Sequence, residues 1–556
     1  MMVAGHTGRQ RPTCGAVRAR QFRPKVPLAF VSIALVVLVE CDAFDAPARY
    51  YSSPNHQTKR GVAAMLRRGH AVASDKVALI QSSHLQSRTS LAFKPPKDDL
   101  DSNVDSTSTD PEIIGIGAYL AIVLPLLLVY ISNQWSRSSL YYLVDFSDSA
   151  DVSAYTAMNV DLGFSQAQYG LLASVAFTAL FAVASLFAGN FADKNDRRAL
   201  TAGSAAVWSA ATLGTSIATT YEQVVICRII MGLACAFTTP AAYTLIRDSV
   251  PPSRAAFANS LYGGGIYLGG ALASLSILLD NSLGWRGALG GIGLYGVVCA
   301  LLSVLVLQAD PKIIVDDETV NAKISETSSK ESGSVTVIED AKAVLSTPRV
   351  RWLFLASFTR FCSGLCIGVW GAPYFRSAFP DDATSYAVVN AFIVGLCGVT
   401  SGILGGVLSD KAAEVANGKG IEENQGRLAV PIAGSLLAVP SWWFAINSST
   451  FQLSMIWLGV EYLVAECWFG SAVAVLQSSV GKERGGTAQG MFALTGAIGN
   501  LAPSLLGVLY GQATSQGVEN QVALSNLLGV AVCSGYLISA VCFFLSSQAP
   551  TTDDSN

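Results

Sequence analysis

Two arginines lie in or beside long apolar stretches of this chain, where a charge is costly. Arg137 follows the apolar run 113–133, and Arg360 lies inside the run 351–376. A charge in an apolar environment is kept for pairing or for binding, so both residues are functional candidates. A guanidinium can bind a carboxylate or a phosphate through two parallel hydrogen bonds. The sequence therefore predicts anion binding by Arg137 and Arg360. The alternative is that each neutralises a helix end or a nearby acid.

Two carboxylates share another apolar stretch, residues 452–478. Glu461 and Glu466 are five residues apart, so they do not lie on one stripe of a helix. A glutamate in an apolar setting can exchange a proton under mild conditions. We expect Glu466, the deeper of the two, to be the proton-coupling residue, with Glu461 as the second candidate. The alternative is that Glu466 is the fixed partner of Arg360.

Four uncharged polar side chains also lie in apolar stretches: Tyr243, Tyr267, Asn390 and Asn500. Groups of this kind more often bridge helices than bind a ligand. We include Tyr243 and Asn390 among the candidate substrate-binding residues.

The positions of the histidines exclude several kinds of chemistry. All four (His6, His56, His70 and His84) precede residue 100, so the apolar body has none for a metal site, a proton relay or a catalytic triad. The sequence also contains neither a Walker-type phosphate loop nor a nucleophile–base constellation. We therefore expect a protein that is not an enzyme and that has no cofactor and no metal. The net charge of −3 argues against a nucleic-acid partner.

The composition indicates a membrane protein. Of 556 residues, 51% are hydrophobic and only 13% are charged, whereas about 25% are charged in soluble domains. Twelve stretches approach the roughly 20 residues that a bilayer requires. The stretches are 113–133, 168–190, 198–220, 222–246, 256–280, 284–308, 351–376, 384–409, 427–446, 452–478, 485–511 and 522–547. The sequence therefore predicts an all-α membrane protein with twelve transmembrane helices.

The twelve spans fall into two groups of six. Residues 113–308 form the first group and residues 351–548 the second, with a central polar loop at 309–350 and a polar tail at 549–556. The loops after even-numbered spans and the central loop carry sixteen Lys and Arg residues, and the other loops carry three. Positive loops stay on the cytosolic side, so both ends of this body should face the cytosol, or the stroma in a plastid.

The first 112 residues read as a targeting region. Residues 1–43 combine a basic start with a short apolar run, as a signal peptide does. Residues 44–112 begin Ser-rich and basic, as in a transit peptide, and end in an acidic linker. This order resembles the bipartite presequence of algae with complex plastids, with Ala43-Phe44-Asp45-Ala46-Pro47 at the junction. We expect the plastid envelope; the alternatives are another endomembrane or the plasma membrane.

The two groups of spans echo each other. Gly189-x-x-x-Asp193-Lys194 follows the second span, and Gly406-x-x-x-Asp410-Lys411 follows the eighth. The segments 249–259 and 479–489 share Ser-Val, Arg and Ala at the same spacing as they enter spans 5 and 11. Transporters with internal repeats bind their solute between the repeats, near the middle of the membrane.

The loop Gly189-Asn190-Phe191-Ala192-Asp193-Lys194-Asn195-Asp196-Arg197-Arg198 resembles the signature loop of the major facilitator superfamily, with Asp196 where the family has Gly. Arg228-x-x-x-Gly232 and Leu283-Gly284-Trp285-Arg286 resemble two further family features. The resemblance covers residues 113–548 and implies the major facilitator fold, two pseudo-symmetric six-helix bundles. It also implies a conformational gate. Its residues would be Gly189, Asp193, Lys194, Arg197, Arg198, Arg228, Gly406, Asp410 and Lys411.

Within the superfamily, the segment Asp161-Leu162-Gly163-Phe164-Ser165-x-x-Gln168-Tyr169-Gly170 is similar to the spinster-like lipid transporters. That branch has Glu three residues after the glycine of span 4, where this chain has Cys235. The departure puts a proton site in the first half in doubt. The family's antiporter signature in helix 5 is absent, which weakens a drug–proton antiporter assignment.

The leading hypothesis is a secondary transporter that moves an anionic or amphipathic solute by alternating access, with proton coupling through a glutamate. The solute is either a lysolipid or a small organic anion; a phosphate or organic-anion transporter of the plastid envelope is the alternative. A hypothesis of another class is a membrane sensor or scaffold that no longer transports. The expected partners are the solute and the bilayer, and the chain is expected to be a monomer.

Overall fold

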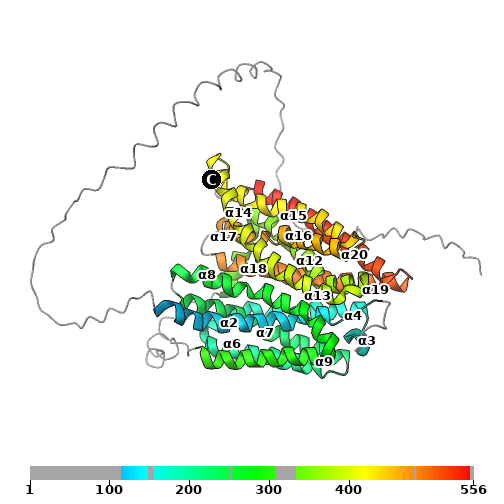
Figure 1. Ribbon diagram of the computed structural model, residues 1–556. Coiled ribbons are helices and arrows are strands. Elements are labelled where there is room, and N and C mark those ends of the chain that lie inside the picture. Colours follow the sequence, from blue (N-terminus) through cyan, green and yellow to red (C-terminus); the bar gives the residue numbers. More distant parts are fainter. Residues whose placement is uncertain (1–113, 148–155, 251, 308–332, 481–483, 551–556) are drawn as a thin grey trace, which may run out of the picture. The chain divides into compact units, whose positions relative to one another are not determined.

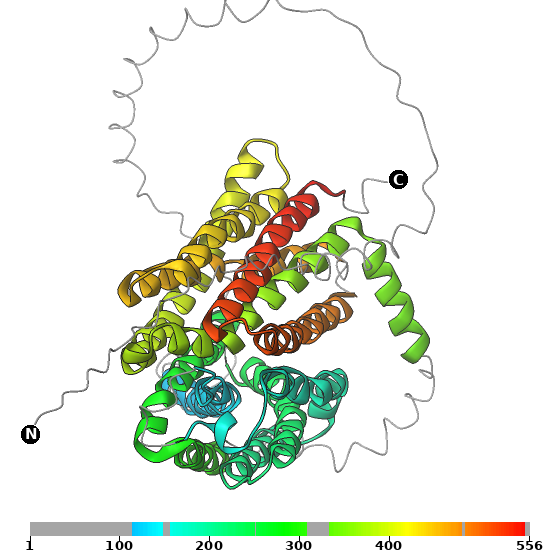
Figure 2. The same ribbon diagram turned by 90° about the vertical axis from the view of Figure 1, so that its right-hand side faces the viewer.

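The computed structural model describes residues 114–147, 156–250, 252–307, 333–480 and 484–550, and these residues are almost entirely helical. The predicted targeting region lies outside them. Helices of the first half, blue to green in Figure 1, gather in one bundle, and helices of the second half, yellow-green to red, gather in another. The view turned by 90° separates the same two groups (Figure 2).

Six spans form the first half. They are α2 (Ile114–Ser138); α4 (Gln166–Gly170) with η2 (Leu171–Val175) and α5 (Ala176–Lys194); α6 (Arg197–Ser216); α7 (Tyr221–Ser249); α8 (Pro252–Gly263) with the start of α9 (Gly265–Val306); and the remainder of α9. Gly284 divides α9 between spans 5 and 6, because its φ of 70° and ψ of 166° are not helical. The short elements η1 (Ser139–Tyr142) and α3 (Met158–Asp161) lie between spans 1 and 2.

The second half repeats this order. Its spans are α12 (Pro348–Ala378); α13 (Ala383–Phe392) with η5 (Ile393–Cys397) and α14 (Gly398–Gly418); α15 (Glu423–Asn447); α16 (Phe451–Ala465) with α17 (Trp468–Ser479); α18 (Gly485–Gly499) with α19 (Leu501–Ser515); and α20 (Asn520–Gln548). The turn η4 (Pro380–Asp382) joins spans 7 and 8. The π-helical turns η2 and η5 occupy the same place in spans 2 and 8, which adds a structural echo to the sequence repeats.

The prediction of twelve transmembrane helices in two groups of six is confirmed. Nine helical segments of the described chain are long and apolar enough to cross a membrane. One of them, Ala258–Val306, is 49 residues long and makes two crossings because it bends at Gly284. The helices α2 and α6, of 25 and 20 residues, complete the twelve.

One expectation needs correction. The segment predicted as a central polar loop contains a helix, α11 (Gly333–Ser346). Val337, Ala341 and Val344 are spaced as on one helical face, and this spacing explains why the segment folds. Val344 is buried in the core of the second half, and Asp340 pairs with Arg484 at the start of span 11 over 3.4 Å. The helix therefore anchors the end of the linker to the second bundle.

Two of the motifs that carry the family resemblance are joined by side-chain contacts. Trp285 donates from Nε1 to Oδ2 of Asp161 over 3.0 Å, and Arg286 pairs with the same carboxylate. Arg286 also donates to the backbone oxygen of Ala218 over 2.9 Å. The motif before span 2 is thus fixed to the start of span 6. We call the end of the bundle that carries the basic loops the basic end, and the end where this contact lies the opposite end.

Candidate functional site

Arg137 and Arg228 meet in the first half. Arg228, near the start of α7, donates from Nη1 to the backbone oxygen of Arg137 over 2.8 Å. The guanidinium carbon of Arg137 lies 4.6 Å from the centre of the Phe177 ring, a cation–π contact with span 2. Arg228 is only 3% exposed and Arg137 is half-buried. Two cations therefore lie together where spans 1, 2 and 4 meet.

The pattern Arg228-x-x-x-Gly232 accounts for this arrangement. A Cβ atom at position 232 would lie 2.1 Å from the backbone oxygen of Phe177, so only glycine lets spans 2 and 4 approach this closely. Gly232 thus places Phe177 under Arg137, while Arg228 holds the backbone of Arg137. The sequence grouped Arg228 with the gate loops, but the structure places it beside Arg137, at the other end of α7 from Asp248.

Neither of the two cations has a counter-ion in the part of the chain that the structure describes. Among the carboxylates of the described residues, none forms an ion pair with Arg137 or Arg228. The position that could have supplied one is Cys235, which is buried and accepts a hydrogen bond from Nδ2 of Asn133 over 2.9 Å. An uncompensated pair of cations in an apolar bundle favours the binding of an anion.

Arg360 lies in the interior of the second half. Its Nη2 donates to the backbone oxygen of Ala465 over 2.7 Å and lies 3.7 Å from Oε1 of Glu466. The rings of Tyr536 and Trp468 lie 4.5 Å and 5.5 Å from its guanidinium carbon. The side chain is 1% exposed, yet neither Nε nor Nη1 has a hydrogen-bond partner among the described residues. Buried donors are nearly always satisfied, so these two N–H groups are available to a ligand.

A helix interruption creates the acceptor for Arg360. Helix α16 ends at Ala465 and α17 begins at Trp468, so Glu466 and Cys467 lie at a break in span 10. The last carbonyls of a helix have no partner within it, and the oxygen of Ala465 is free to accept from the arginine. Interrupted membrane helices of this kind often form binding sites in transporters.

Two glycines from neighbouring spans pack against this interruption. A Cβ atom on Gly405 of span 8 would lie 2.5 Å from Cα of Cys467, and one on Gly434 of span 9 would lie 2.4 Å from the oxygen of Val464. The interruption is therefore held by tertiary packing. The sequence carried no local sign of it, because neither proline nor glycine occurs between Val464 and Trp468.

Glu461 belongs to the same cluster as Arg360. It is 2% exposed and accepts a hydrogen bond from the hydroxyl of Tyr536, whose ring faces Arg360. Glu466, in contrast, has a side chain that is 30% exposed. One carboxylate is thus enclosed and the other is accessible, in agreement with their different faces on the helix.

The other two predicted substrate-binding residues lie in helix contacts. Tyr243 is 42% exposed, and its ring meets that of Tyr262 edge to face at 5.2 Å. Asn390 of span 8 is buried and donates from Nδ2 to the hydroxyls of Tyr142 and Ser274 over 3.2 and 3.0 Å. In this conformation Asn390 joins the two halves.

The predicted gate residues at the basic end tie neighbouring spans together. Arg197 at the start of span 3 pairs with Asp248 at the end of span 4 over 2.7 Å, and Arg198 donates to the backbone oxygen of Val304 at the end of span 6. In the second half, Asp410 lies 3.5 Å from Nε of Arg427. Gly406 and Lys411 lie in α14 together with Asp410. The contacts of Gly189, Asp193 and Lys194 lie outside the described part.

Contacts at the opposite end were missed in the sequence. Arg376, at the end of span 7, donates from Nη1 to the backbone oxygens of Tyr142 and Val144 over 3.0 and 3.3 Å, and its Nη2 lies 3.4 Å from Asp145. In the sequence, Arg376 is one of the three cations assigned to the loops on this side. Nothing in its own neighbourhood showed that its partners lie some 230 residues away.

Further contacts join the halves between this end and the middle of the spans. Tyr169 of span 2 donates from its hydroxyl to the backbone oxygen of Val369 over 2.7 Å. Asn500 of span 11 donates from Nδ2 to the hydroxyl of Thr178 over 2.5 Å. The halves are therefore linked toward the opposite end by hydrogen bonds and by the ion pair of Arg376.

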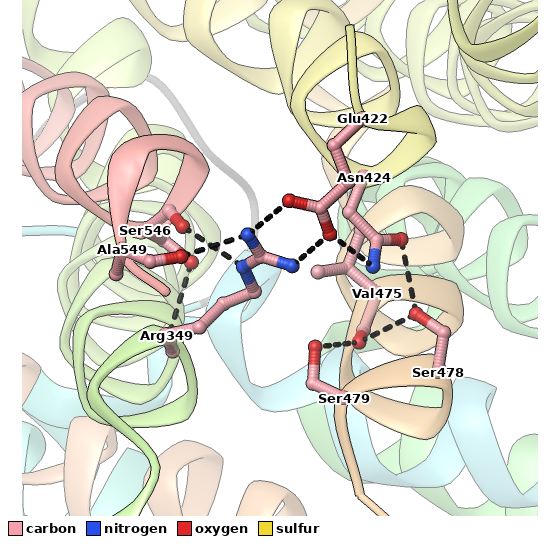
Figure 3. A network of polar contacts seen from close by, with 8 residues as sticks. All are labelled: Arg349, Glu422, Asn424, Val475, Ser478, Ser479, Ser546 and Ala549. Atoms are coloured by element: carbon pink, nitrogen blue, oxygen red, sulfur yellow. Dashed lines mark hydrogen bonds and ion pairs between the residues drawn. The ribbon is translucent and has the colours of Figure 1, made fainter. Parts of the chain in front are cut away.

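A second arginine network stabilises the basic end of the second half (Figure 3). Arg349 binds Glu422 with both terminal nitrogens, and its Nη2 also donates to the backbone oxygen of Ala549 over 2.7 Å. Its Nε donates to the backbone oxygen of Ser546 over 3.3 Å. Hydrogen bonding by Arg349 lowers the pKa of Glu422, which lies just before α15. The network joins the start of span 7 to spans 9 and 12.

Sequence comparison connects this architecture to known transporters. The chain is 25% identical over 402 residues to an MFS-type efflux pump from Mycolicibacterium smegmatis, an alignment that covers 70% of this chain and 85% of the pump. It is 24% identical over 409 residues to a probable sulfoacetate transporter, SauU, from Cupriavidus necator, covering 72% of this chain and 92% of the transporter.

Among solved structures, a bacterial homologue of the human lysosomal transporter Spinster, in an inward-facing and unoccupied conformation, is similar with a TM-score of 0.60 at 18% identity. The alignment covers 78% of this chain and 98% of the homologue, and it shows the fold. The sequence model of the Major Facilitator Superfamily matches residues 126–503 of this chain. The chain therefore belongs to the Major Facilitator Superfamily and is a multi-pass membrane protein of the secondary-transporter type.

Proposed function

We propose that the protein transports an anionic solute whose charged group binds Arg137 in the first half and Arg360 in the second. The observation that carries this proposal is the state of the two arginines. Among the described residues, Arg137 and its neighbour Arg228 have no counter-ion, and the buried Nε and Nη1 of Arg360 have no hydrogen-bond partner. A solute that is itself an anion would satisfy both sites.

The charged residues of the two arginine sites support an anion over a cation. They are Arg137, Arg228, Arg360, Glu461 and Glu466. Three are cations, and both carboxylates are already engaged with Tyr536 and Arg360. The similarity to SauU, named as a probable sulfoacetate transporter, and to PcaK of Pseudomonas putida, named as a 4-hydroxybenzoate transporter, is consistent with an organic anion. The similarity of residues 161–170 to the spinster-like lipid transporters keeps a lysolipid among the candidates.

Glu466 is the residue that we propose to couple transport to protons. It is the accessible carboxylate of the cluster, and its distance of 3.7 Å from Arg360 is long for an ion pair. Protonation of Glu466 would release Arg360 to the solute, and deprotonation would return the arginine to its internal partner. Glu461, held by Tyr536, would keep Arg360 in place through the ring of that tyrosine.

A transport assay tests the proposal. Proteoliposomes with the purified protein would be given four labelled solutes, namely sulfoacetate, D-glucarate, 4-hydroxybenzoate and a lysophosphatidate. We expect uptake of at least one, and at least a tenfold loss with Arg137→Ala and with Arg360→Ala. Arg351→Ala is the matched control, because Arg351 is an exposed residue of the same helix as Arg360. Unchanged uptake in both variants, or no uptake of any of the four, would contradict the proposal and favour a sensor or scaffold.

We propose the plastid envelope as the site of action, from the order of signal-like and transit-like segments in residues 1–112. A fluorescent protein fused behind these residues would be expressed in an alga with a complex plastid. Delivery to the plastid supports this location, and secretion contradicts it.

A further inference from the structure

Spans 5 and 8 belong to different halves and lie in close contact. Ser274 donates from its hydroxyl to the backbone oxygen of Ala387 over 2.9 Å. A Cβ atom on Gly270 would lie 3.1 Å from Cγ1 of Val394. Spans 5 and 8 are antiparallel, and Tyr267 of span 5 contacts span 8 closer to the basic end than Gly270 does.

The ring of Tyr267 lies directly on span 8. A Cβ atom at Gly398 would come within 2.5 Å of Cδ1 of this ring, so position 398 must be glycine while the ring is there. A Cβ atom at Gly402 would lie 3.7 Å from the Tyr267 hydroxyl, which places that hydroxyl one turn further along span 8. Tyr267 is half-buried, and its hydroxyl makes no hydrogen bond with any described residue.

The same face of span 8 leads to the interruption of span 10. Gly398, Gly402 and Gly405 are spaced four and three residues apart and therefore share one stripe of the helix. Gly405 packs against Cys467, the residue that follows Glu466. The Tyr267 hydroxyl and the backbone of Cys467 therefore contact span 8 at positions three residues apart, about 4.5 Å along the helix axis.

Arg360 supplies the second observation at this place. Its side chain is 1% exposed, it pairs with Glu466, and its Nε and Nη1 have no hydrogen-bond partner among the described residues. A tyrosine hydroxyl from the first half and a buried guanidinium from the second half thus lie near the same interruption of span 10, and both have donors without a partner among the described residues.

We infer that Tyr267 is the contribution of the first half to the anion site at Arg360, donating a hydrogen bond from its hydroxyl to the oxyanion that Arg360 binds. This inference rests on the proposed function and deepens it. The solute must offer at least two oxygens on its charged group, as a carboxylate, a sulfonate or a phosphate does. The site is complete only while spans 5 and 8 are in contact, so affinity differs between the two conformations of the transport cycle.

Two substitutions test this role in the proteoliposome assay with the same four solutes. Tyr267→Phe keeps the ring on Gly398 and removes only the hydroxyl. Because a hydrogen bond to a charged group is lost, we expect KM for the transported solute to rise about tenfold, while kcat stays within about threefold of the wild-type value. Gly398→Ala should raise KM in the same direction, because the added methyl group displaces the ring. Tyr295→Phe, a tyrosine of span 6 that packs on Trp135, is the matched control and should keep the wild-type KM.

The outcomes separate this inference from the function on which it depends. A raised KM in Tyr267→Phe with a normal control supports the role of the hydroxyl. A wild-type KM in Tyr267→Phe, for a solute whose uptake is lost in Arg360→Ala, overturns the inference and leaves the proposed function intact. Absence of uptake of all four solutes by the wild-type protein overturns both.

Discussion

Arg228 donates a hydrogen bond to the backbone oxygen of Arg137 and so fixes the end of span 1 to span 4. The contact uses the backbone of Arg137 and leaves its guanidinium free to stack on Phe177. Arg228 is therefore a positioning residue, and Arg137 is the residue that we propose to touch the solute. This division of roles leads to the first prediction.

Removal of the Arg228 side chain should impair transport through the placement of Arg137. In Arg228→Ala we expect uptake to fall about tenfold, because the loss of one charge-assisted hydrogen bond is large in an apolar setting. Arg228→Lys should recover only part of the uptake, since an ammonium cannot reproduce the fork of a guanidinium. Initial rates in proteoliposomes measure both variants. Equal rates for wild type and Arg228→Ala would show that Arg137 needs no such support.

A carboxylate introduced at Cys235 should compete with the solute. Cys235 is buried in span 4, about two helical turns after Arg228. A glutamate there would pair with Arg137 or Arg228. We expect Cys235→Glu to raise KM about tenfold at neutral pH, with partial recovery as the medium is acidified and the new carboxyl is neutralised. Cys235→Ser, which retains a partner for Asn133, is the control. A KM in Cys235→Glu that matches the serine variant at every pH would argue against an anion at this place.

The transmembrane spans are the part of the structure that the sequence predicts most directly. Apolar length and loop charge predicted all twelve, because each helix must satisfy its backbone within the bilayer and needs a fixed minimum length to cross it. Arg360 and Glu466 lie together, a pairing that the sequence offered as the alternative to proton coupling. These features follow from properties of single residues and from short-range pattern.

The parts that escaped prediction depend on contacts between distant residues. The stretch Ala465-Glu466-Cys467 is compatible with a helix, and it is interrupted because Arg360, Gly405 and Gly434 act on it from three other spans. Arg376 looked like a loop cation until its partners at the end of span 1 were known. Such features need the packed bundle, and no window of sequence contains them.

Glu466→Gln should remove the response of uptake to a pH gradient. The wild-type protein is expected to take up more solute when the outer medium is more acidic, since a proton on Glu466 would release Arg360. The amide cannot exchange a proton, so its uptake should be the same with and without a gradient, and net transport against a concentration gradient should be lost. Glu461→Gln is the companion variant, because Glu461 is enclosed by Tyr536. A gradient response that survives in Glu466→Gln and disappears in Glu461→Gln would transfer the role to Glu461.

The packing of the span 10 interruption can be tested with adjacent glycines. A methyl group at Gly405 would collide with Cys467, whereas one at Gly406 would meet no atom within 4 Å. We expect Gly405→Ala to lower stability by about 1–3 kcal/mol, the usual range for overpacking, and to lower the apparent Tm of the detergent-purified protein by several degrees. Gly406→Ala should be neutral. Equal melting temperatures for the two variants would mean that the interruption yields readily to added volume.

The Arg349–Glu422 pair predicts how the second half responds to acid. Arg349 lowers the pKa of Glu422 in the folded protein below its ordinary value of 4.5. The folded state therefore binds this proton less readily than the unfolded state, and the pair contributes stability at pH values above 4.5 that declines as pH falls through the lowered pKa. Glu422 is partly exposed, so solvent screening limits the effect. We expect Glu422→Gln to reduce the apparent Tm at pH 7 and to bring it close to that of the wild type under strongly acidic conditions. Melting curves across this pH range measure the difference, and a Tm deficit that is independent of pH would assign the loss to packing instead of charge.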